Sequence, residues 1–157
     1  MSIVPEELAE FISRAPWLDL TSRDARLRTT IRRCFGAVVA DDGERVTTFV
    51  PAVRAEKLRQ DLLDNGGVSF IVSNTSENYR THQLKGRFLE WRAPTPEEEA
   101  IAQAGCAKVA QELEAVGLSP RLFDTFIALP CAAVTFRVEE IFDQTPGPRA
   151  GTRLHPS

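Results

Sequence analysis

Cationic and neutral hydrogen-bonding side chains gather in three stretches of this chain. The first, residues 14–33, contains six arginines against two acidic residues and ends at Arg33. The second contains Arg54 and Lys57. The third is a polar run, residues 74–86, with four such side chains in quick succession: Arg80, Thr81, Gln83 and Lys85. Guanidinium and ammonium groups are common ligands of phosphate. Together with the neutral donors, they would suit a ligand that has a phosphate, a ribityl chain and a heterocycle.

Each stretch also has a purely structural explanation. An arginine-rich strand or a polar strand face can simply be exposed to water. Gly66 and Gly67 follow a predicted helix, so we expect them to end it and not to bind phosphate, because anions bind at helix N-termini. The sequence shows no dinucleotide fingerprint, P-loop, nucleophile elbow or metalloprotease helix. The residues alone therefore leave a ligand site and a solvated surface both open.

Composition limits the classes of protein and of site. A chain of 157 residues with 43% hydrophobic residues fits a single domain, residues 1–157. The net charge of −3 gives no reason to expect nucleic acid or a membrane surface as a partner. The three cysteines and two histidines show no zinc-ligand spacing, and free thiols suit a reducing compartment. With no signal segment or membrane-spanning run recognised, we expect a soluble, cytoplasmic protein.

Apolar spacing predicts the elements that would position these residues. A proline and two acidic residues begin an N-terminal helix, residues 5–15. Two β-prone runs, residues 29–40 and 45–50, flank the turn at 41–43 and predict a hairpin. The chain is then expected to form a helix that ends at 65–67, a strand at 68–73 and a long strand at 80–91.

Local signals are strongest in the second half of the chain. Gly86 lies within the long predicted strand, where a glycine indicates a bulge or the close approach of another backbone or ligand. Thr95 and Glu98 form a capping box, which predicts that they begin a helix and have no catalytic part. The remaining expectations are a helical insertion over 95–128 with a second, shorter helix after 119, and a strand at 132–142. The Pro/Gly-rich tail at 144–157 is expected to be a loop or a partner-binding arm.

These elements favour a mainly β (α+β) fold. The strands do not alternate with helices, so a doubly wound parallel sheet is excluded. A six-stranded antiparallel split β-barrel with flanking helices satisfies the predicted order. The chain shows no internal repeat and no change in amino-acid composition that would mark a domain boundary, so we expect one domain.

The order of these parts resembles the FMN-binding split barrel of the pyridoxamine 5'-phosphate oxidase-like family. The parts that carry the resemblance are a hairpin at 33–50, a basic helix start at 54–57, a turn into a strand at 65–68, and a strand of the type Arg-Thr-x-Gln-x-Lys-Gly at 80–86. The stretch 142–148 also resembles a closing motif of family members. The similarity covers most of residues 29–89 and resumes near 132.

The resemblance implies FMN as cofactor and a homodimer with the flavin between subunits. Arg33 matches the arginine of the family's first flavin-binding strand, Lys57 with Arg54 matches the phosphate motif, and Thr81 matches a strand position that contacts the flavin. Arg80, Gln83 and Lys85 complete the candidate set. The chain departs from the family where Glu56 replaces a serine and Val38 a lysine, and substrate-binding residues of the true oxidases find no match.

The resemblance predicts an FMN-dependent oxidoreductase or flavin reductase of unknown substrate. Deazaflavin or haem could replace FMN in the same fold. A non-catalytic flavin-binding or sensing module, and a barrel kept for protein contacts alone, are the alternatives of other classes. No catalytic residue is assigned by any of these readings.

Overall fold

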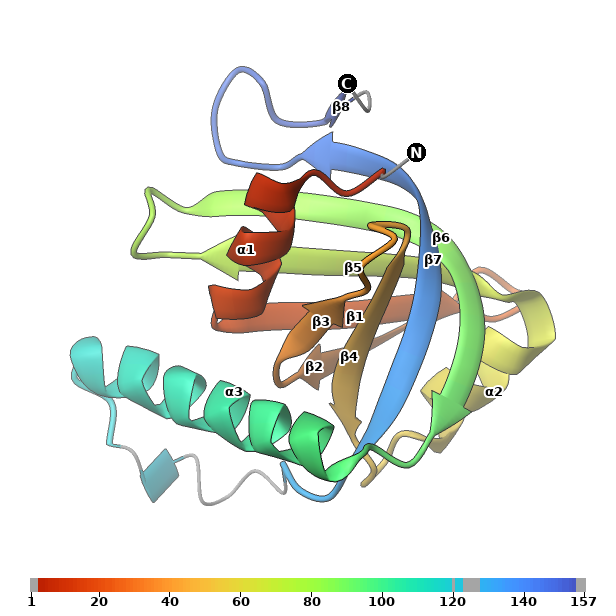
Figure 1. Cartoon of the computed structure of the whole chain (residues 1–157), viewed down its shortest axis with the longest axis horizontal. Coiled ribbons are helices and arrows are strands. Elements are labelled where there is room, and N and C mark those ends of the chain that lie inside the picture. Colours follow the sequence, from red (N-terminus) through yellow and green to blue (C-terminus); the bar gives the residue numbers. More distant parts are fainter. Residues whose placement is uncertain (1–2, 120, 123–127, 155–157) are drawn as a thin grey trace.

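The computed structural model describes residues 3–119, 121–122 and 128–154, and its centre is one antiparallel β-sheet (Figure 1). The sheet curls into a split barrel, as the sequence predicts. The strand order is β2-β1-β5-β6-β7-β4-β3, and β8 pairs with β7 outside this path. The strands are β1 (Trp17–Arg23), β2 (Thr29–Cys34), β3 (Ala37–Val39), β4 (Arg45–Pro51), β5 (Gly67–Asn74), β6 (Arg80–Arg92), β7 (Cys131–Asp143) and β8 (Thr152–Leu154).

Three α-helices of the described part pack against this sheet: α1 (Glu6–Arg14), α2 (Glu56–Asn65) and α3 (Pro96–Ala115). Helix α1 lies across the front of the sheet in Figure 1 and buries Leu8, Phe11 and Ile12 in the main core. Helix α3 covers a second, smaller core built around Phe35 and Phe49. The predicted helices at 5–15 and before 65–67 are confirmed. The short helix expected after 119 lies largely outside the described residues.

Within the described residues the sheet has eight strands, whereas six were predicted. Strand β1 was missed because only Leu18 and Leu20 mark its buried face, among polar neighbours. The run 29–40 is not one strand but two, β2 and β3, because Gly36 breaks it with a φ of 81°. A Cβ on Gly36 would stand 2.8 Å from Ile101 Cγ2, so this break is also where α3 packs closely. The predicted hairpin around residues 41–43 is confirmed as β3–β4.

The capping box at the start of α3 is confirmed. The backbone N–H of Glu98 donates to Thr95 Oγ1 at 3.3 Å, and the backbone N–H of Thr95 donates to Glu98 Oε2 at 2.8 Å. Arg92, at the end of β6, adds hydrogen bonds of 2.6 and 2.7 Å to the same carboxylate. The pKa of Glu98 is lowered chiefly by this hydrogen bonding to Arg92. Glu98 therefore ties the start of α3 to the end of β6.

The C-terminal tail folds back on the sheet. The backbone N–H of Gln144 donates to the Thr81 carbonyl at 2.8 Å, and that of Gly151 to the Asp143 carbonyl at 2.7 Å. Strand β8 then pairs with the end of β7, from Ile141 to Asp143. The tail was expected to be a loop or an arm, and this short strand corrects that expectation in part.

Gly86 is where two backbones meet, as predicted. The register of β6 on β7 shifts between Lys85 and Gly86, and a Cβ on Gly86 would overlap the carbonyl oxygen of Arg137. Since strand backbones cannot give way without breaking ladder hydrogen bonds, no larger side chain fits here.

We expect Gly86→Ala to lower the free energy of unfolding by ~2 kcal/mol or more, because the new methyl overlaps β7. Urea denaturation monitored by circular dichroism measures this. Arg87→Ala, next to it on the same strand and exposed, should change the free energy by less than about 0.5 kcal/mol. Equal, small effects of both substitutions would contradict the close contact.

Candidate functional site

Strand β6 divides the predicted site residues between two faces of the sheet. Side chains of a strand alternate between faces. His82 and Leu84 are buried toward the core, whereas Thr81, Gln83 and Lys85 point outward. Arg80 shares the inner side with His82, to which it donates a hydrogen bond. The structure therefore brings Thr81, Gln83 and Lys85 together and separates Arg80 from them.

The outward side chains of β6 form a network with the neighbouring strand and the tail. Thr81 Oγ1 lies 3.0 Å from Ser73 Oγ, and Gln83 Nε2 donates to Ser69 Oγ at 2.8 Å. Gln144 Nε2 donates to Gln83 Oε1 at 2.9 Å. Because each partner fixes the next, these neutral donors and acceptors are held in place without a ligand.

Arg33 extends this face to the edge of the sheet. In register, Arg33 pairs with Asp19, Asp19 with Ile71, and Ile71 with Gln83. Arg33 Nη1 lies 3.2 Å from Asp19 Oδ2, and its guanidinium carbon lies 5.0 Å from the centre of the Trp17 ring. Burial raises the pKa of Asp19, and the charge of Arg33 opposes that rise. We call this surface the outer sheet face: Arg33, Asp19, Ile71, Thr81, Gln83 and Lys85.

Half-buried apolar groups lie among these polar residues. Ile71 sits between Asp19 and Gln83 in the register, and Lys85 Nζ lies 4.6 Å from the centre of the Phe142 ring. The ring nitrogen of Trp17 is buried and has no hydrogen-bond partner within the described ranges. The outer sheet face thus combines flat apolar surface with fixed donors, as a heterocycle-binding surface requires.

Arg54 and Lys57 lie around the edge of the sheet from this face, at the start of α2. The β2 residue that meets them is Arg32, not Arg33, since Arg32 Nη2 donates to the Arg54 carbonyl. Lys57 donates to Asp61 and lies 3.7 Å from Asp24. The structure therefore does not place Arg33 beside Arg54 and Lys57. Arg32, one residue earlier and on the opposite face of β2, takes that place.

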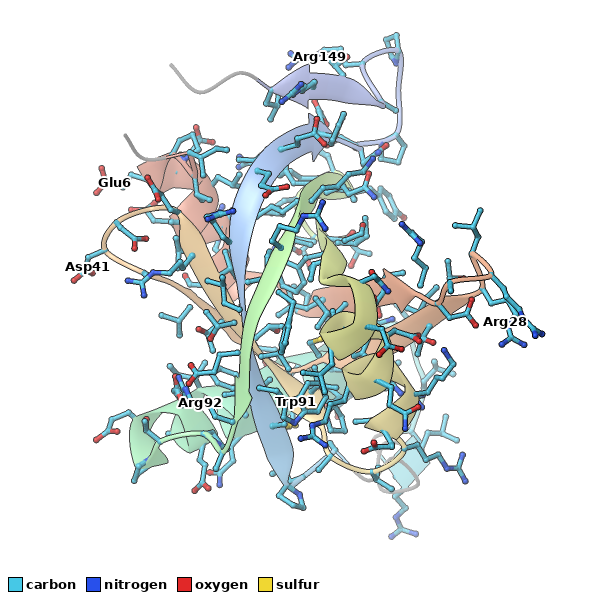
Figure 2. The ribbon with its side chains drawn as sticks, turned by 90° about the vertical axis from the view of Figure 1, so that its right-hand side faces the viewer. Glu6, Arg28, Asp41, Trp91, Arg92 and Arg149 are labelled. Atoms are coloured by element: carbon cyan, nitrogen blue, oxygen red, sulfur yellow. The ribbon has the colours of Figure 1, made fainter. Side chains whose placement is uncertain are left out.

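The group around α2 has an excess of positive charge. Asp24 also pairs with Arg28, at 2.8 Å, near the end of the β1–β2 hairpin, which projects from the body in Figure 2. Hydrogen bonds from the backbone of Arg28, then from its side chain, lower the pKa of Asp24 to about 2. We call this group the cationic corner. It contains four cationic residues and two carboxylates, and Arg54 contacts the others through its backbone carbonyl: Arg28, Arg32, Arg54, Lys57, Asp24 and Asp61.

Two features of the cationic corner indicate a binding function. Arg54 has a φ of 58°, a left-handed conformation that is uncommon for residues other than glycine and is found often at functional sites. Arg32 Nε is buried and has no hydrogen-bond partner in the described part of the chain. A buried donor without an acceptor is costly, so an anion that reached Arg32 would remove that cost.

Sequence reasoning missed Arg32 as a site residue, as well as the supporting residues Ser69, Ser73 and Gln144. Arg32 and Arg33 are adjacent, and a one-residue change of register exchanges the two faces. The signal that could have separated them is Cys34, whose complete burial puts Arg32 on the inner side. The hydroxyls of β5 could have been found as the positions that alternate with Val68, Phe70 and Val72.

Arg80 belongs to a different environment, between β6 and α1. Its Nε donates to His82 Nε2 at 3.1 Å, its Nη2 donates to Glu7 at 3.0 Å, and it lies over the Phe11 ring at 4.6 Å. Burial and the nearby charge of Arg80 lower the pKa of His82. The imidazole is therefore neutral at neutral pH and accepts a hydrogen bond from the guanidinium.

Among the described residues, no group of three or more His, Cys, Asp or Glu side chains could hold a metal ion. None of the helices in the described ranges is long and apolar enough to cross a membrane.

Comparisons with known proteins identify the fold. No family model and no curated protein matches the chain, but solved structures do. HupZ of Group A Streptococcus aligns with a TM-score of 0.57 and 15% identity over 95% of this chain and 100% of its own. A putative pyridoxamine 5'-phosphate oxidase of Lactobacillus delbrueckii gives 0.55 and 10%, over 90% and 95%. An FMN-binding protein of Syntrophomonas wolfei gives 0.51 and 12%, over 87% and 85%. The chain thus has the split-barrel fold of these proteins.

The environment of His82 predicts a dependence of stability on pH. Its pKa is lowered in the folded state, so below the ordinary value of about 6.5 the unfolded chain binds more protons. Stability is then present above that pH and is lost as the pH falls through and below it. The charged groups that face His82 are Arg80 on β6, Glu7 on α1 and Asp143 on β7.

We expect the free energy of unfolding of the native protein to fall more steeply between pH 7 and 5 than that of His82→Gln. The glutamine can still accept a hydrogen bond from Arg80 but does not titrate. Urea denaturation at a series of pH values measures both slopes. Parallel curves would contradict the lowered pKa.

Proposed function

We propose that the protein binds FMN along the edge of the sheet at β2, and that it is an FMN-dependent oxidoreductase or flavin reductase. The observation that carries the proposal is the placement of two complementary surfaces on either side of one edge strand. The outer sheet face offers fixed neutral donors and apolar surface, and the cationic corner offers positive charge. The likeness in fold to an FMN-binding protein supports the same ligand.

The charge of the cationic corner suits a phosphate monoester. Four cations against two carboxylates leave an excess of two positive charges, and a phosphate monoester carries about −1.5 to −2 near neutral pH. Arg32 and Arg54 supply fork-shaped donors, the geometry that matches phosphate oxygens. The ammonium of Lys57 is shared with Asp61 and Asp24, so Lys57 contributes mainly by compensating these carboxylates.

The outer sheet face suits the remainder of the ligand. Thr81 and Gln83 lie where hydroxyls and ring heteroatoms can be bound, and Ile71 and Phe142 supply apolar surface beside them. Arg33 stands at the end of this row, near the edge. In this arrangement Arg33 and Lys85 orient the ring system, while Arg32 and Arg54 bind the phosphate.

Redox chemistry would be supplied by the flavin when bound, because the chain's own thiols are poorly suited to it. Burial raises the pKa of Cys34 and of Cys131 to about 12, and it also raises the pKa of Cys106. Reaction as a nucleophile requires the thiolate, and all three thiols stay protonated at neutral pH. The protein's part is to bind the cofactor, orient it and control access to it.

The same fold is compatible with other ligands and with functions other than catalysis. The same surfaces could bind a deazaflavin, which shares the phosphate and ribityl parts. Haem would use neither the excess positive charge of the cationic corner nor the neutral donors of the outer sheet face. A flavin-binding sensor would bind FMN without turning over a nicotinamide donor. A barrel kept for protein contacts would bind no flavin, and its arginines would be surface charge.

Substitutions in the two surfaces should distinguish binding of the FMN phosphate from binding of its ring system. Arg32→Met and Arg54→Met should each weaken FMN roughly tenfold to a hundredfold, because charge-assisted hydrogen bonds contribute about 1.5–3 kcal/mol each. Riboflavin, which lacks the phosphate, should bind native protein more weakly and respond little to these substitutions. Arg33→Met should weaken both flavins together. Flavin fluorescence titration measures every affinity.

Arg59→Met is the matched control, since Arg59 is an exposed arginine on α2 outside the cationic corner. It should leave both flavin affinities unchanged. Equal affinity of native protein for FMN and riboflavin, with no response to Arg32→Met or Arg54→Met, would contradict the phosphate site. Anaerobic addition of NADH or NADPH to the FMN complex then separates an enzyme from a sensor: bleaching of the flavin absorbance supports the oxidoreductase.

We further propose a homodimer that covers the outer sheet face. Ile71 and Phe142 on this face are half-buried in the single chain, and Ile31, on the edge strand β2, is 59% exposed. A second copy would complete the walls of the flavin site and exclude water from it. We expect the Gln144 to Gly147 segment, in which Gln144 donates to Gln83 on this face, to reach the partner.

Light scattering coupled to size-exclusion chromatography should find a dimer at micromolar concentration. Ile71→Glu should shift it to monomer, because a carboxylate would be buried unpaired in the interface. Leu63→Glu, at an exposed apolar position on α2, should leave the dimer intact. A native monomer at these concentrations would contradict the proposal.

A further inference from the structure

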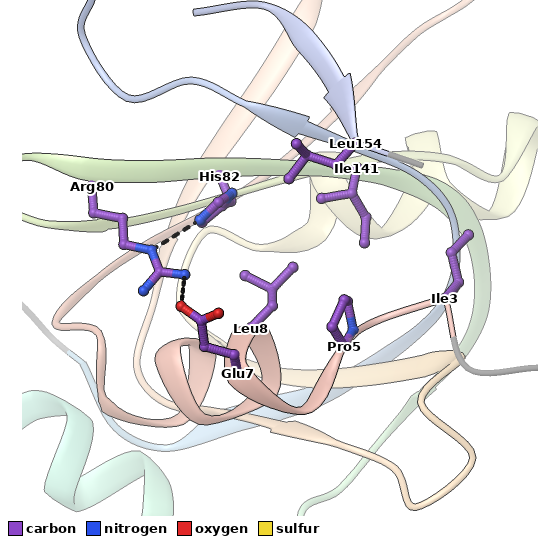
Figure 3. A pocket seen from close by; sticks show the side chains of 8 residues that line it. All are labelled: Ile3, Pro5, Glu7, Leu8, Arg80, His82, Ile141 and Leu154. Atoms are coloured by element: carbon purple, nitrogen blue, oxygen red, sulfur yellow. Dashed lines mark hydrogen bonds and ion pairs between the residues drawn. The ribbon is translucent and has the colours of Figure 1, made fainter. Parts of the chain in front are cut away.

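A pocket of about 120 Å³ lies between α1 and the ends of strands β6, β7 and β8 (Figure 3). Its β6 residue His82 is on the opposite face of the strand from Thr81 and Gln83. Most of its walls are aliphatic. Its apolar lining residues come from the N-terminal segment, β7 and β8: Ile3, Pro5, Leu8, Ile141 and Leu154. Its polar lining residues are Glu7, Arg80 and His82. Nothing in the FMN proposal uses this pocket.

His82 presents a hydrogen-bond donor that lacks an acceptor. Its side chain is 7% exposed, and its Nδ1 is buried without a partner among the residues that the structure describes. Its other nitrogen, Nε2, accepts from Arg80. A neutral imidazole carries one proton, so the proton is on Nδ1, and that nitrogen is a donor. A buried donor without an acceptor is rare in folded proteins, but protein atoms cover this nitrogen, so a ligand in the pocket contacts the rest of the imidazole ring.

Arg80 adds positive charge at the same end of the pocket. It reaches Glu7 through Nη2, so Nη1 is not engaged in that ion pair. Glu7 has a side chain 78% exposed and can turn to solvent when another carboxylate approaches. Asp143, the other carboxylate close to His82, accepts from the Thr145 backbone at 2.9 Å and lies 3.6 Å from Arg149. The guanidinium of Arg80 thus supplies the donors at the polar end.

The size of the pocket limits its ligand. A cavity of about 150 Å³ lined by aliphatic and aromatic residues holds benzene, so a cavity of this size holds about six non-hydrogen atoms. The acceptor must be at one end of the ligand, because the polar groups lie at one end of the pocket (Figure 3). A branched aliphatic tail would fill the remainder against Leu8, Ile141 and Leu154.

We propose that this pocket binds a small branched aliphatic monocarboxylate, with its oxygens on the Arg80 guanidinium, beside the His82 ring. The site is separate from the outer sheet face, so its ligand and FMN bind independently. Glu7 is the group that the ligand displaces.

Isobutyrate is the probe. Amide NMR spectra of the native protein, recorded during a titration at neutral pH, should show saturable shifts confined to α1, the start of β6 and the ends of β7 and β8. Isobutyramide, which has the same shape without the charge, should bind at least about tenfold more weakly. FMN should not displace isobutyrate.

Arg80→Met should weaken isobutyrate roughly tenfold or more, and Leu8→Phe should abolish binding by filling the pocket. Arg87→Met removes an exposed arginine from the same strand and should leave the affinity unchanged. Absence of saturable shifts in native protein would overturn the proposal, as would equal affinity for acid and amide, or equal loss in the Arg80 and Arg87 variants. Each result is independent of whether FMN binds.

Discussion

The two-residue alternation of β6 is the constraint on which the rest of the structure depends. This strand pairs with β5 on one side and β7 on the other, at the middle of the curled sheet. Its even-numbered residues, from His82 to Gly86, must fit the core, and Gly86 is the extreme case because the β7 backbone fills the space of its side chain. Its odd-numbered residues are thereby fixed on the outer face. A chain that kept the composition of β6 but shifted its register by one would lose both the core and the outer network.

The same constraint gives the protein two separate polar sites. Thr81 and Gln83 point toward the surface proposed for the flavin, while Arg80 and His82 point toward α1 and the second pocket. The two surfaces differ in chemistry as well as in place. The outer network is built from neutral partners that already satisfy one another, whereas the inner pair leaves a donor without an acceptor in the described structure. A large ligand with many weak contacts suits the first, and a small anion suits the second.

The sequence predicted the features whose cause is local. The capping box of α3, the end of α2 at Gly66 and the alternation of β5 all depend on residues close together in the chain. Gly86 was correctly singled out, although the partner backbone at Arg137 could not be known without the strand pairing. Strand β1 was missed because its burial comes from packing between β2 and β5 rather than from its own composition. The break at Gly36 depends on α3, which lies far along the chain.

In the candidate site too, the sequence predicted what depends on neighbouring residues and missed what depends on distant segments. Thr81, Gln83 and Lys85 were predicted together, and strand periodicity is enough to place them on one face. Arg33 was grouped with Arg54 and Lys57, but contact with α2 depends on which face of β2 turns inward, and Cys34 decides that by its burial. Arg80 was grouped with its neighbours on β6, yet α1, which comes from the other end of the sequence, provides its partners.

The central claim is that a flavin lies across the edge strand β2, with its phosphate on the side of α2 and its ring on the outer sheet face. A crystal structure of the protein grown with FMN tests this most directly. We expect electron density for the phosphate beside Arg32 and Arg54, and for the ring system beside Thr81 and Gln83. Density for FMN at any other surface, or none at saturating FMN, would contradict it.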